Sequence, residues 1–305
     1  MRILRLLLPS LALVGVLLMG CQANPEITLT APIPPGLEGD LLVDTAWLAG
    51  ESSSDSIRIL DVRSPDDYRQ GHIPGAINLP RSEFTIQVAD IKNLVPSPEE
   101  FEAAISHVGV GPDTHVVIVD GGNLLWATRL LWTLDYFGHP KTSILHGGLA
   151  AWTAEEREVS RVAPQVDGTT FTATPNASLV VDIDEILRRY DSGDIKILDN
   201  RSSAEYSGED VRAERGGHVP GAINIDWANH LSGAEIPSLK TAGELSVLYE
   251  NVGISPGDEV ASYCQTAVRA THGYMVLKLL GYDSLRVYDG SWIEWGNRDD
   301  TPIEQ

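Results

Sequence analysis

Cysteine is scarce in this chain, because its 305 residues include only Cys21 and Cys264. A fold held together by several disulfides is excluded, and so is a zinc site made of four cysteines. The histidines, cysteines and carboxylates also show no spacing typical of a metal site. We therefore expect neither a metal nor an organic cofactor.

Basic residues are scarce as well. The chain has 22 Lys and Arg against 43 Asp and Glu, which gives a formal net charge of −21. Such a protein repels the phosphates of nucleic acids, so we expect no nucleic-acid partner. Apolar residues make up 43% of the chain, however, and its length is sufficient for two domains with buried cores.

The N-terminus lacks an apolar run long enough to span a membrane comfortably. Arg2 and Arg5 precede an apolar segment, residues 6–18, that is short and interrupted by Pro9. This order of features is typical of a signal peptide, and we assign residues 1–20 to one.

The run Leu18-Met19-Gly20-Cys21 resembles the lipobox of bacterial lipoproteins. The resemblance implies cleavage before Cys21 and lipid attachment to that cysteine, which would anchor the chain to a membrane. Gln22, rather than Asp, follows it, and by resemblance to Gram-negative sorting this implies the outer membrane, with the domains facing the periplasm. The alternative is an ordinary secretory peptide with an incidental cysteine.

Cys264 then has no partner for an intramolecular disulfide. It follows an apolar run at 259–263 that is typical of a strand end, and it precedes a spaced apolar segment at 270–280 that is typical of a helix. Unpaired N–H groups and the positive end of the helix dipole favour a thiolate in this setting. Cys264 is thus our candidate nucleophile, and the alternative is a buried, inert thiol.

The two halves of the chain repeat each other with a period of about 140 residues, which is typical of a duplicated domain. The matching segments are 59–64 and 197–202, 71–78 and 217–224, 116–120 and 260–264, and 147–152 and 290–295.

Short apolar strands alternate with helical segments in both halves. We expect strands at 57–61, 76–79, 115–120, 142–146, 195–199, 222–225, 258–263 and 285–288, and helices at 97–108, 124–137, 179–190, 241–251 and 268–280. This alternation predicts an α/β fold in which each domain has a mostly parallel sheet with helices on both faces. Ligands bind beyond the carboxyl ends of such strands, where Cys264 is placed.

Composition sets the domain boundaries. Residues 21–38 contain four prolines and are predicted to be a tether, domain 1 is predicted at 39–157, and domain 2 at 179–305. The segment 158–178, with its threonine, proline and glycine, is the predicted linker.

Several motifs together resemble the tandem-domain rhodanese family of sulfurtransferases. Asp61-Val62-Arg63 and the run at 71–78, with their copies at 199–201 and 217–224, resemble its amino-terminal signature, and the Gly-Ser-Trp-Ile-Glu-Trp run at 290–295 resembles its carboxyl-terminal signature. The resemblance covers nearly all of residues 40–300 and implies two tandem rhodanese-like domains.

Asp120 stands in domain 1 where domain 2 has Cys264, and a carboxylate cannot hold a sulfane sulfur. We expect domain 1 to be non-catalytic and to wall the active-site cleft; the alternative is that Asp120 acts as an acid–base residue.

The resemblance implies a double displacement. Cys264 would take the outer sulfur of a small-molecule donor such as thiosulfate as a persulfide, and a thiophilic acceptor such as cyanide or a thiol would remove it. The loop Cys-Gln-Thr-Ala-Val-Arg at 264–269 resembles bacterial thiosulfate sulfurtransferases more than the mercaptopyruvate type. The alternatives are a 3-mercaptopyruvate sulfurtransferase and a persulfide carrier, without turnover, for a partner protein.

The loop itself supplies most of the predicted binding groups. The sulfur is expected to accept hydrogen bonds from the backbone N–H groups of Gln265, Thr266, Ala267, Val268 and Arg269. Arg269 also offers a fork of donors to an anionic substrate. A phosphatase or arsenate reductase with a Cys-x5-Arg loop would need arginine at position 270, and alanine is there. Ala267 replaces a glycine that is common in the family, which costs about 1 kcal/mol if the position requires φ > 0.

Side chains outside the loop complete the predicted site. Arg201 matches the family's substrate-binding arginine, and the alternative is a surface arginine paired with Glu205 or Asp199. Trp227 matches an aromatic of the family's pocket, and the alternative is a core residue. Arg63, the copy of Arg201 in domain 1, is expected to be structural. So are His72 and His218, which occupy matching turns.

Overall fold

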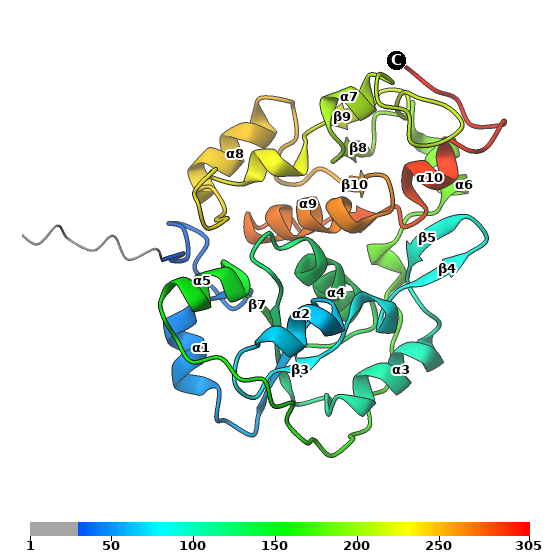
Figure 1. The fold of residues 1–305 in the computed structure, drawn as a ribbon. Coiled ribbons are helices and arrows are strands. Elements are labelled where there is room, and N and C mark those ends of the chain that lie inside the picture. Colours follow the sequence, from blue (N-terminus) through cyan, green and yellow to red (C-terminus); the bar gives the residue numbers. More distant parts are fainter. Residues whose placement is uncertain (1–29) are drawn as a thin grey trace, which may run out of the picture.

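Two α/β lobes, both built on parallel sheets, make up the computed structural model, which describes residues 30–305 (Figure 1). The first sheet has the order β1-β7-β6-β2-β3 and the second the order β11-β10-β8-β9, and every pairing within them is parallel. Helices flank both sheets. The predicted fold class is therefore confirmed.

The elements of domain 1 follow one another along the chain. They are β1 Leu42–Val43, α1 Thr45–Glu51, β2 Ile57–Asp61, α2 Pro65–Gln70, β3 Ile77–Asn78, the 3₁₀ turn η1 Arg81–Glu83, β4 Ile86–Val88, β5 Ile91–Leu94, α3 Pro98–His107, β6 His115–Val119, α4 Leu125–Tyr136, β7 Thr142–Leu145 and α5 Gly148–Ala154.

Domain 2 repeats most of this order. Its elements are η2 Ala177–Leu179, α6 Ile183–Arg189, β8 Lys196–Asp199, α7 Ser203–Tyr206, β9 Ile223–Asn224, η3 Trp227–His230, α8 Ala242–Glu250, β10 Val260–Tyr263, α9 Val268–Leu279, β11 Leu285–Val287 and α10 Ser291–Trp295. Every strand and helix expected from the sequence is present, with ends shifted by a few residues. The shortest elements were not expected, because they are too short to show a period.

The central strands β6 and β10 are buried along their whole length, as apolar runs in a sheet covered on both faces must be. Helices α3 and α8 begin at capping boxes, Ser97 with Glu100 and Thr241 with Glu244. These local signals place the strand ends and helix starts that surround the site.

Helices α4 and α9 pack against each other in the middle of the molecule (Figure 1). Both are buried over most of their length, and Thr128 Oγ1 of α4 lies 3.4 Å from Thr271 Oγ1 of α9. Each helix follows a residue in the left-handed region, Leu124 at φ 67° and Ala267 at φ 61°. The two loops that turn into these helices are the loops of Asp120 and Cys264.

The predicted tether at 21–38 is wrong for its last residues. Ala31 and Leu37 are buried, the carbonyl oxygen of Ala31 contacts His146 Nδ1 of domain 1, and the carbonyl oxygen of Pro35 accepts from the N–H of Ala242 in domain 2. A turn closed by the N–H of Leu37 and the carbonyl of Pro34 lies in this segment, which is packed against both domains rather than free. The predicted linker at 158–178 contains no strand or helix before η2 and runs along domain 1, where Phe171 is buried.

A hairpin of domain 1 has only a reduced counterpart in domain 2, where Leu231 and Leu239 form an isolated antiparallel bridge. Strands β4 and β5 pair in antiparallel fashion and extend from domain 1 toward α10 of domain 2 (Figure 1). The sequence analysis did not predict it, because strands of three and four residues are too short to show a period.

Within residues 30–305 no helix is long and apolar enough to cross a membrane. The predicted signal peptide at 1–20 and the predicted lipidation site Cys21 lie outside the described residues.

Candidate active site

Cys264 follows the last residue of β10 and lies in the loop that leads into α9, as the sequence predicted. Its exposed fraction is 1%, and it is the free cysteine of the described chain. The carbonyl of Cys264 accepts from the N–H of Trp292, which ties this loop to α10. The candidate nucleophile is thus held rigidly at the carboxyl edge of the sheet.

The loop N–H groups do not all face a ligand, which corrects the predicted ring of five donors. The N–H of Ala267 donates to Ser291 Oγ at 3.0 Å, and the N–H of Val268 donates to the carbonyl of Thr266 at 2.9 Å. The first hydrogen bond inside α9 runs from Thr271 to Ala267, so Arg269 has no partner within the helix for its N–H. Among residues 30–305 the N–H groups of Gln265 and Thr266 also have none, and these three remain available to an anion.

Arg269 is held at the rim of the loop by a carboxylate from α7. Its Nη1 and Nη2 donate to the two oxygens of Glu205 at 2.6 and 2.8 Å. Arg212 Nη1 lies 3.6 Å from Glu205 Oε1, and Gln265 Nε2 donates to the carbonyl of Arg212. Glu205 therefore connects two cations beside the candidate nucleophile.

Electrostatics keep this pair ionised. Burial raises the pKa of Glu205, but hydrogen bonds from Arg269 and its charge prevail and lower that pKa to about 2. Burial opposes the charge of Arg269, while Glu205 and the nearby Cys264 sulfur outweigh it and raise the pKa of Arg269. The ion pair thus keeps a fixed positive charge next to Cys264.

Glu205→Gln is expected to lower the free energy of unfolding by about 3 kcal/mol at neutral pH, because a shift of one pKa unit corresponds to about 1.4 kcal/mol. The folded pKa lies below the ordinary value of 4.5, so this stability is present above pH 4.5 and is lost as the pH falls toward 2. Glutamine keeps the capping box of α7. Urea unfolding of both proteins at several pH values measures the difference.

Asp67→Asn is the matched control for this experiment. Asp67 is the third residue after the cap of α2, as Glu205 is for α7, but it is exposed and its side chain bonds only to Ser64. We expect a small effect from it. A deficit for Glu205→Gln that is equally large at pH 2.5 and pH 7 would contradict the assigned ion pair.

Arg201, the predicted substrate-binding arginine, is buried, and its guanidinium is engaged by protein groups. Its exposed fraction is 1%; Nε and Nη2 donate to Asp199, and Nη2 also donates to the carbonyl of Gly217. Arg63 in domain 1 makes the same contacts with Asp61 and the carbonyl of Gly71. The arrangement recurs beside Asp120, where no thiol is present, which favours a structural role for Arg201. The pairing with Asp199 is that of the alternative, although the residue is buried rather than on the surface.

The duplicated histidines are structural in the same way. His72 stacks on Tyr68 and contacts its carbonyl through Nδ1, and His218 does the same with Tyr206. Each matching turn thereby fixes the short helix that precedes it.

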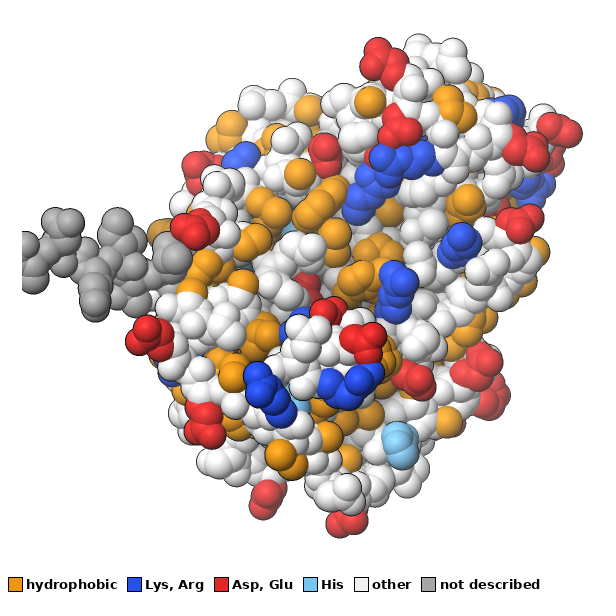
Figure 2. Space-filling view, in the orientation of Figure 1, with side chains coloured by type: hydrophobic (Ala, Val, Ile, Leu, Met, Phe, Trp, Pro, Cys, Tyr) orange, Lys and Arg blue, Asp and Glu red, His pale blue; other side chains and the backbone are white. Residues whose placement is uncertain are grey.

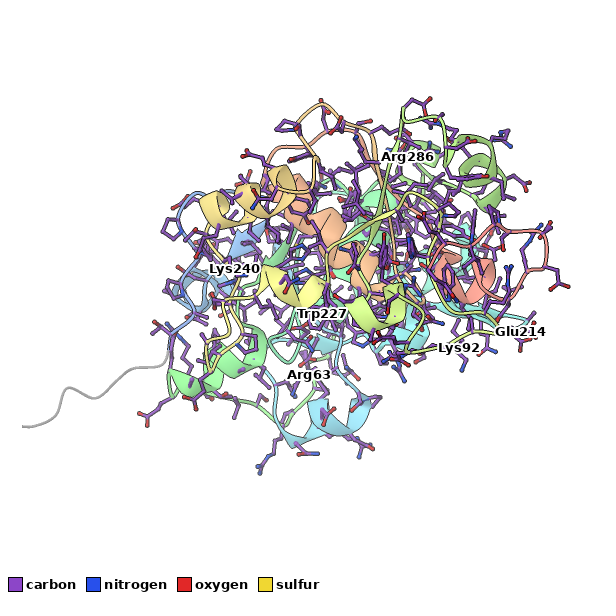
Figure 3. The ribbon with its side chains drawn as sticks, turned by 90° about the horizontal axis from the view of Figure 1, so that it is seen from above. Arg63, Lys92, Glu214, Trp227, Lys240 and Arg286 are labelled. Carbon is purple, nitrogen blue, oxygen red and sulfur yellow. The ribbon has the colours of Figure 1, made fainter. Side chains whose placement is uncertain are left out.

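Trp227, the predicted pocket aromatic, lies at the start of η3 and is partly exposed. Its ring packs edge-on against His272 at 5.6 Å between centroids. Burial lowers the pKa of His272 to about 3, so this imidazole is neutral. In Figure 3 Trp227 lies near the middle of the molecule, and Lys92 of the hairpin lies to its right.

The β4–β5 hairpin contributes a contact that sequence reasoning missed. Asn93, at φ 63°, donates from Nδ2 to Thr266 Oγ1 at 3.0 Å. Domain 1 thus holds the predicted ligand residue Thr266 from across the domain boundary. On the face shown in Figure 2 hydrophobic side chains gather between the two lobes, and Lys and Arg side chains flank them.

The corresponding loop of domain 1 is filled by its own side chain. Asp120 is buried, and its Oδ1 accepts from the N–H of Gly122 at 2.7 Å. Burial raises the pKa of Asp120 to about 6. A cleft of about 550 Å³ opens beside it. The residue in the left-handed region is Leu124, the fourth after Asp120, whereas Ala267 is the third after Cys264. Trp126 is the second residue of α4, as Arg269 is the second residue of α9.

In the part of the chain that the structure describes, no group of three or more His, Cys, Asp or Glu side chains is placed to hold a metal ion.

Comparison with known proteins identifies the family of this chain. The model of the rhodanese-like domain matches twice, at residues 44–155 and 182–298. A thiosulfate sulfurtransferase of Azotobacter vinelandii is 35% identical over 266 residues, which cover 87% of this chain and 97% of the relative. A sulfur carrier protein of Thermus thermophilus is 34% identical, with coverage of 87% and 96%.

A solved structure agrees with the fold. The crystal structure of an Escherichia coli 3-mercaptopyruvate sulfotransferase superposes with a TM-score of 0.76 and 30% identity, over 83% of this chain and 99% of that one. Both lobes match the family model, and the relatives are aligned along almost their whole length. The chain therefore belongs to the rhodanese family and carries two rhodanese-like domains in tandem.

Proposed function

We propose that this protein transfers sulfane sulfur from thiosulfate to a thiophilic acceptor through a persulfide on Cys264. The observation that carries the proposal is the position of this cysteine: it lies in the loop between β10 and α9, near the cation Arg269, and domain 1 has Asp120 at the same place. The names of several relatives, which are sulfurtransferases at about one-third identity, support the reaction class.

The proposed first step is a displacement at sulfur. The Cys264 thiolate attacks the outer sulfur of thiosulfate, a new S–S bond forms, and the S–S bond of thiosulfate breaks so that its electron pair leaves with sulfite. The free N–H groups of Gln265, Thr266 and Arg269 are donors for the negative charge that now lies on the second sulfur.

The proposed second step restores the enzyme. Cyanide or a thiolate attacks the outer sulfur of the persulfide and forms a bond to it, and the Cys264 thiolate leaves with the electron pair of the broken S–S bond. The two steps balance without an external oxidant or reductant. Domain 1 takes no chemical part in either step; it holds Thr266 through Asn93.

A donor comparison on the purified protein tests this proposal. We expect faster formation of thiocyanate from thiosulfate and cyanide than of pyruvate from 3-mercaptopyruvate. Mass spectrometry should show a gain of about 32 Da, one sulfur, on the peptide with Cys264. Faster turnover of mercaptopyruvate would change the donor. A persulfide that forms once and passes only to a protein partner would favour the carrier function.

We also propose that Cys21 carries a lipid anchor that holds the protein at the outer membrane, facing the periplasm. The support is the sequence of charge, apolar run and lipobox before Cys21. Cys21→Ser should move the protein from the membrane fraction to the soluble fraction, as measured by fractionation of cells in Triton X-114. Equal partitioning of the two proteins would refute the anchor.

A further inference from the structure

Ser291 is a buried residue in an unfavourable backbone conformation. It begins α10, its exposed fraction is 0%, and its φ is 52°. Residues other than glycine seldom adopt the left-handed region, and where they do, the strain often accompanies a functional constraint. This backbone conformation would favour glycine at position 291, so the presence of serine requires a reason that involves its side chain.

The Ser291 hydroxyl joins the two ends of the Cys264 turn. Its Oγ accepts from the N–H of Cys264 at 3.3 Å and from the N–H of Ala267 at 3.0 Å, and it donates to the carbonyl of Tyr288 at 2.9 Å. A hydroxyl has one proton to donate and two acceptor sites, so all of its hydrogen-bonding capacity is used. Gln265 and Thr266, whose N–H groups are free, lie between the two clamped residues.

Domain 1 closes the equivalent turn in another way. Gly148 stands at the position of Ser291 with φ 54°, and the N–H of Leu149 donates to the carbonyl of Asp120 as that of Trp292 donates to the carbonyl of Cys264. A Cβ atom on Gly148 would lie 2.6 Å from the carbonyl oxygen of Asp120, 2.7 Å from the nitrogen of Gly122 and 2.9 Å from Asp120 Oδ1. The backbone of this turn and the carboxylate of Asp120 together leave no room for a side chain at 148, and the carboxylate itself accepts a loop N–H.

Domain 1 also fixes the segment that carries Ser291. Asp289 accepts from Arg129 Nη1 at 2.6 Å and from the N–H of Val95 at 2.9 Å, and both donors belong to domain 1. Arg129 is fully buried. The non-catalytic domain is therefore attached two residues before the hydroxyl that holds the Cys264 turn.

We propose that Ser291 is a positioning residue for sulfur transfer, whose hydroxyl clamps the Cys264 turn. In domain 1 the side chain of Asp120 closes the equivalent turn, so in domain 2 the side chain at position 264 is not needed for that purpose. The role in transfer rests on the proposed function. The clamp itself does not. Because serine accepts both N–H groups from behind the turn, the side chain at 264 can be a nucleophile.

The test compares Ser291→Ala and Ser291→Gly with Ser143→Ala. Both variants at 291 lose the hydroxyl. Glycine also removes the strain at φ 52° and matches Gly148 of domain 1. The glycine variant can therefore be measured even if the alanine variant folds poorly. Ser143 is a buried serine of β7 in domain 1 with two hydrogen bonds of its own, which makes it a control for the loss of a buried hydroxyl.

We expect kcat for thiosulfate and cyanide to fall roughly 10- to 100-fold in both variants at 291, with KM for thiosulfate changed by less than about threefold, because a misplaced nucleophile slows the chemical step. Amide hydrogen exchange in the peptide with Cys264 and Ala267 should become at least about tenfold faster. Ser143→Ala should change neither readout.

A kcat within about threefold of the Ser143→Ala value would overturn the positioning role, given that misplacement acts on the chemical step. Unchanged exchange at Cys264 and Ala267 would overturn the clamp. If the wild-type protein transfers sulfur from no donor, the proposed function fails, and the exchange measurement still decides whether Ser291 holds the turn.

Discussion

Cys264→Ser is expected to abolish sulfur transfer, with a loss of more than about 1,000-fold in kcat/KM. The replacement is nearly isosteric, but a serine hydroxyl stays protonated at neutral pH and forms no persulfide. The gain of about 32 Da with thiosulfate should disappear at the same time. Thiocyanate formation and mass spectrometry measure the two effects.

Cys21→Ser is the control for this experiment, because Cys21 is the only other cysteine of the chain. It should leave the kinetic constants unchanged in detergent solution. Sulfur transfer that survives in Cys264→Ser would refute the assignment of the nucleophile. Alkylation by iodoacetamide at neutral pH separates a reactive thiolate from a thiol shut in the core, since the exposed fraction of Cys264 is 1%.

Arg201→Ala is expected to lower the free energy of unfolding by about 3–5 kcal/mol, because removing one partner of a buried ion pair leaves the other charge uncompensated. Asp199, with an exposed fraction of 0%, would keep only the hydroxyl of Tyr263 and the N–H of residue 201 as donors. The guanidinium also stacks on Trp292 at 4.3 Å from the ring centroid, and that contact would be lost. Urea denaturation measures the change.

Arg63→Ala provides the matched comparison, since Arg63 makes the same contacts in domain 1 beside a turn without a thiol. Both variants should lose stability, and in neither should KM for thiosulfate rise by more than about threefold once the protein is folded. Wild-type stability with a raised KM in Arg201→Ala alone would return this residue to the substrate site.

The strand, turn and helix around Cys264 could be predicted because the repeat aligned them with an apolar strand and a spaced apolar helix in both halves. The contacts of Arg201 could not be predicted from the repeat. The motif identified a recurring arginine, but whether its guanidinium meets a donor or a buried carboxylate depends on the packing of Trp292 and Tyr263, which lie far away in the sequence.

Glu205 and Ser291 were missed for related reasons. The capping box of Ser202 and Glu205 is visible in the sequence, yet its second contact, to Arg269, spans 64 residues. The repeat aligned Ser291 with Gly148, and a side chain that replaces a glycine beside the nucleophile was the available signal.

Ala267 is a case in which a local rule anticipated the geometry. Its φ of 61° matches that of Leu124 in domain 1, so both turns place a residue other than glycine in the left-handed region. Such a residue costs about 1–2 kcal/mol relative to an unstrained one. The hydrogen bond from the N–H of Ala267 to Ser291 holds it there.

The contact between Thr128 and Thr271 has a consequence for symmetry. These residues occupy equivalent positions, the fourth in α4 and the fourth in α9, and their hydroxyls meet. Equivalent residues that touch are the mark of an isologous interface, in which one surface is complementary to itself about a two-fold axis. Joined in one chain, the two copies form a covalent pseudo-dimer. The sequences of the two halves can then diverge independently. One half retains the cysteine, and the other half serves as the permanent partner of that domain.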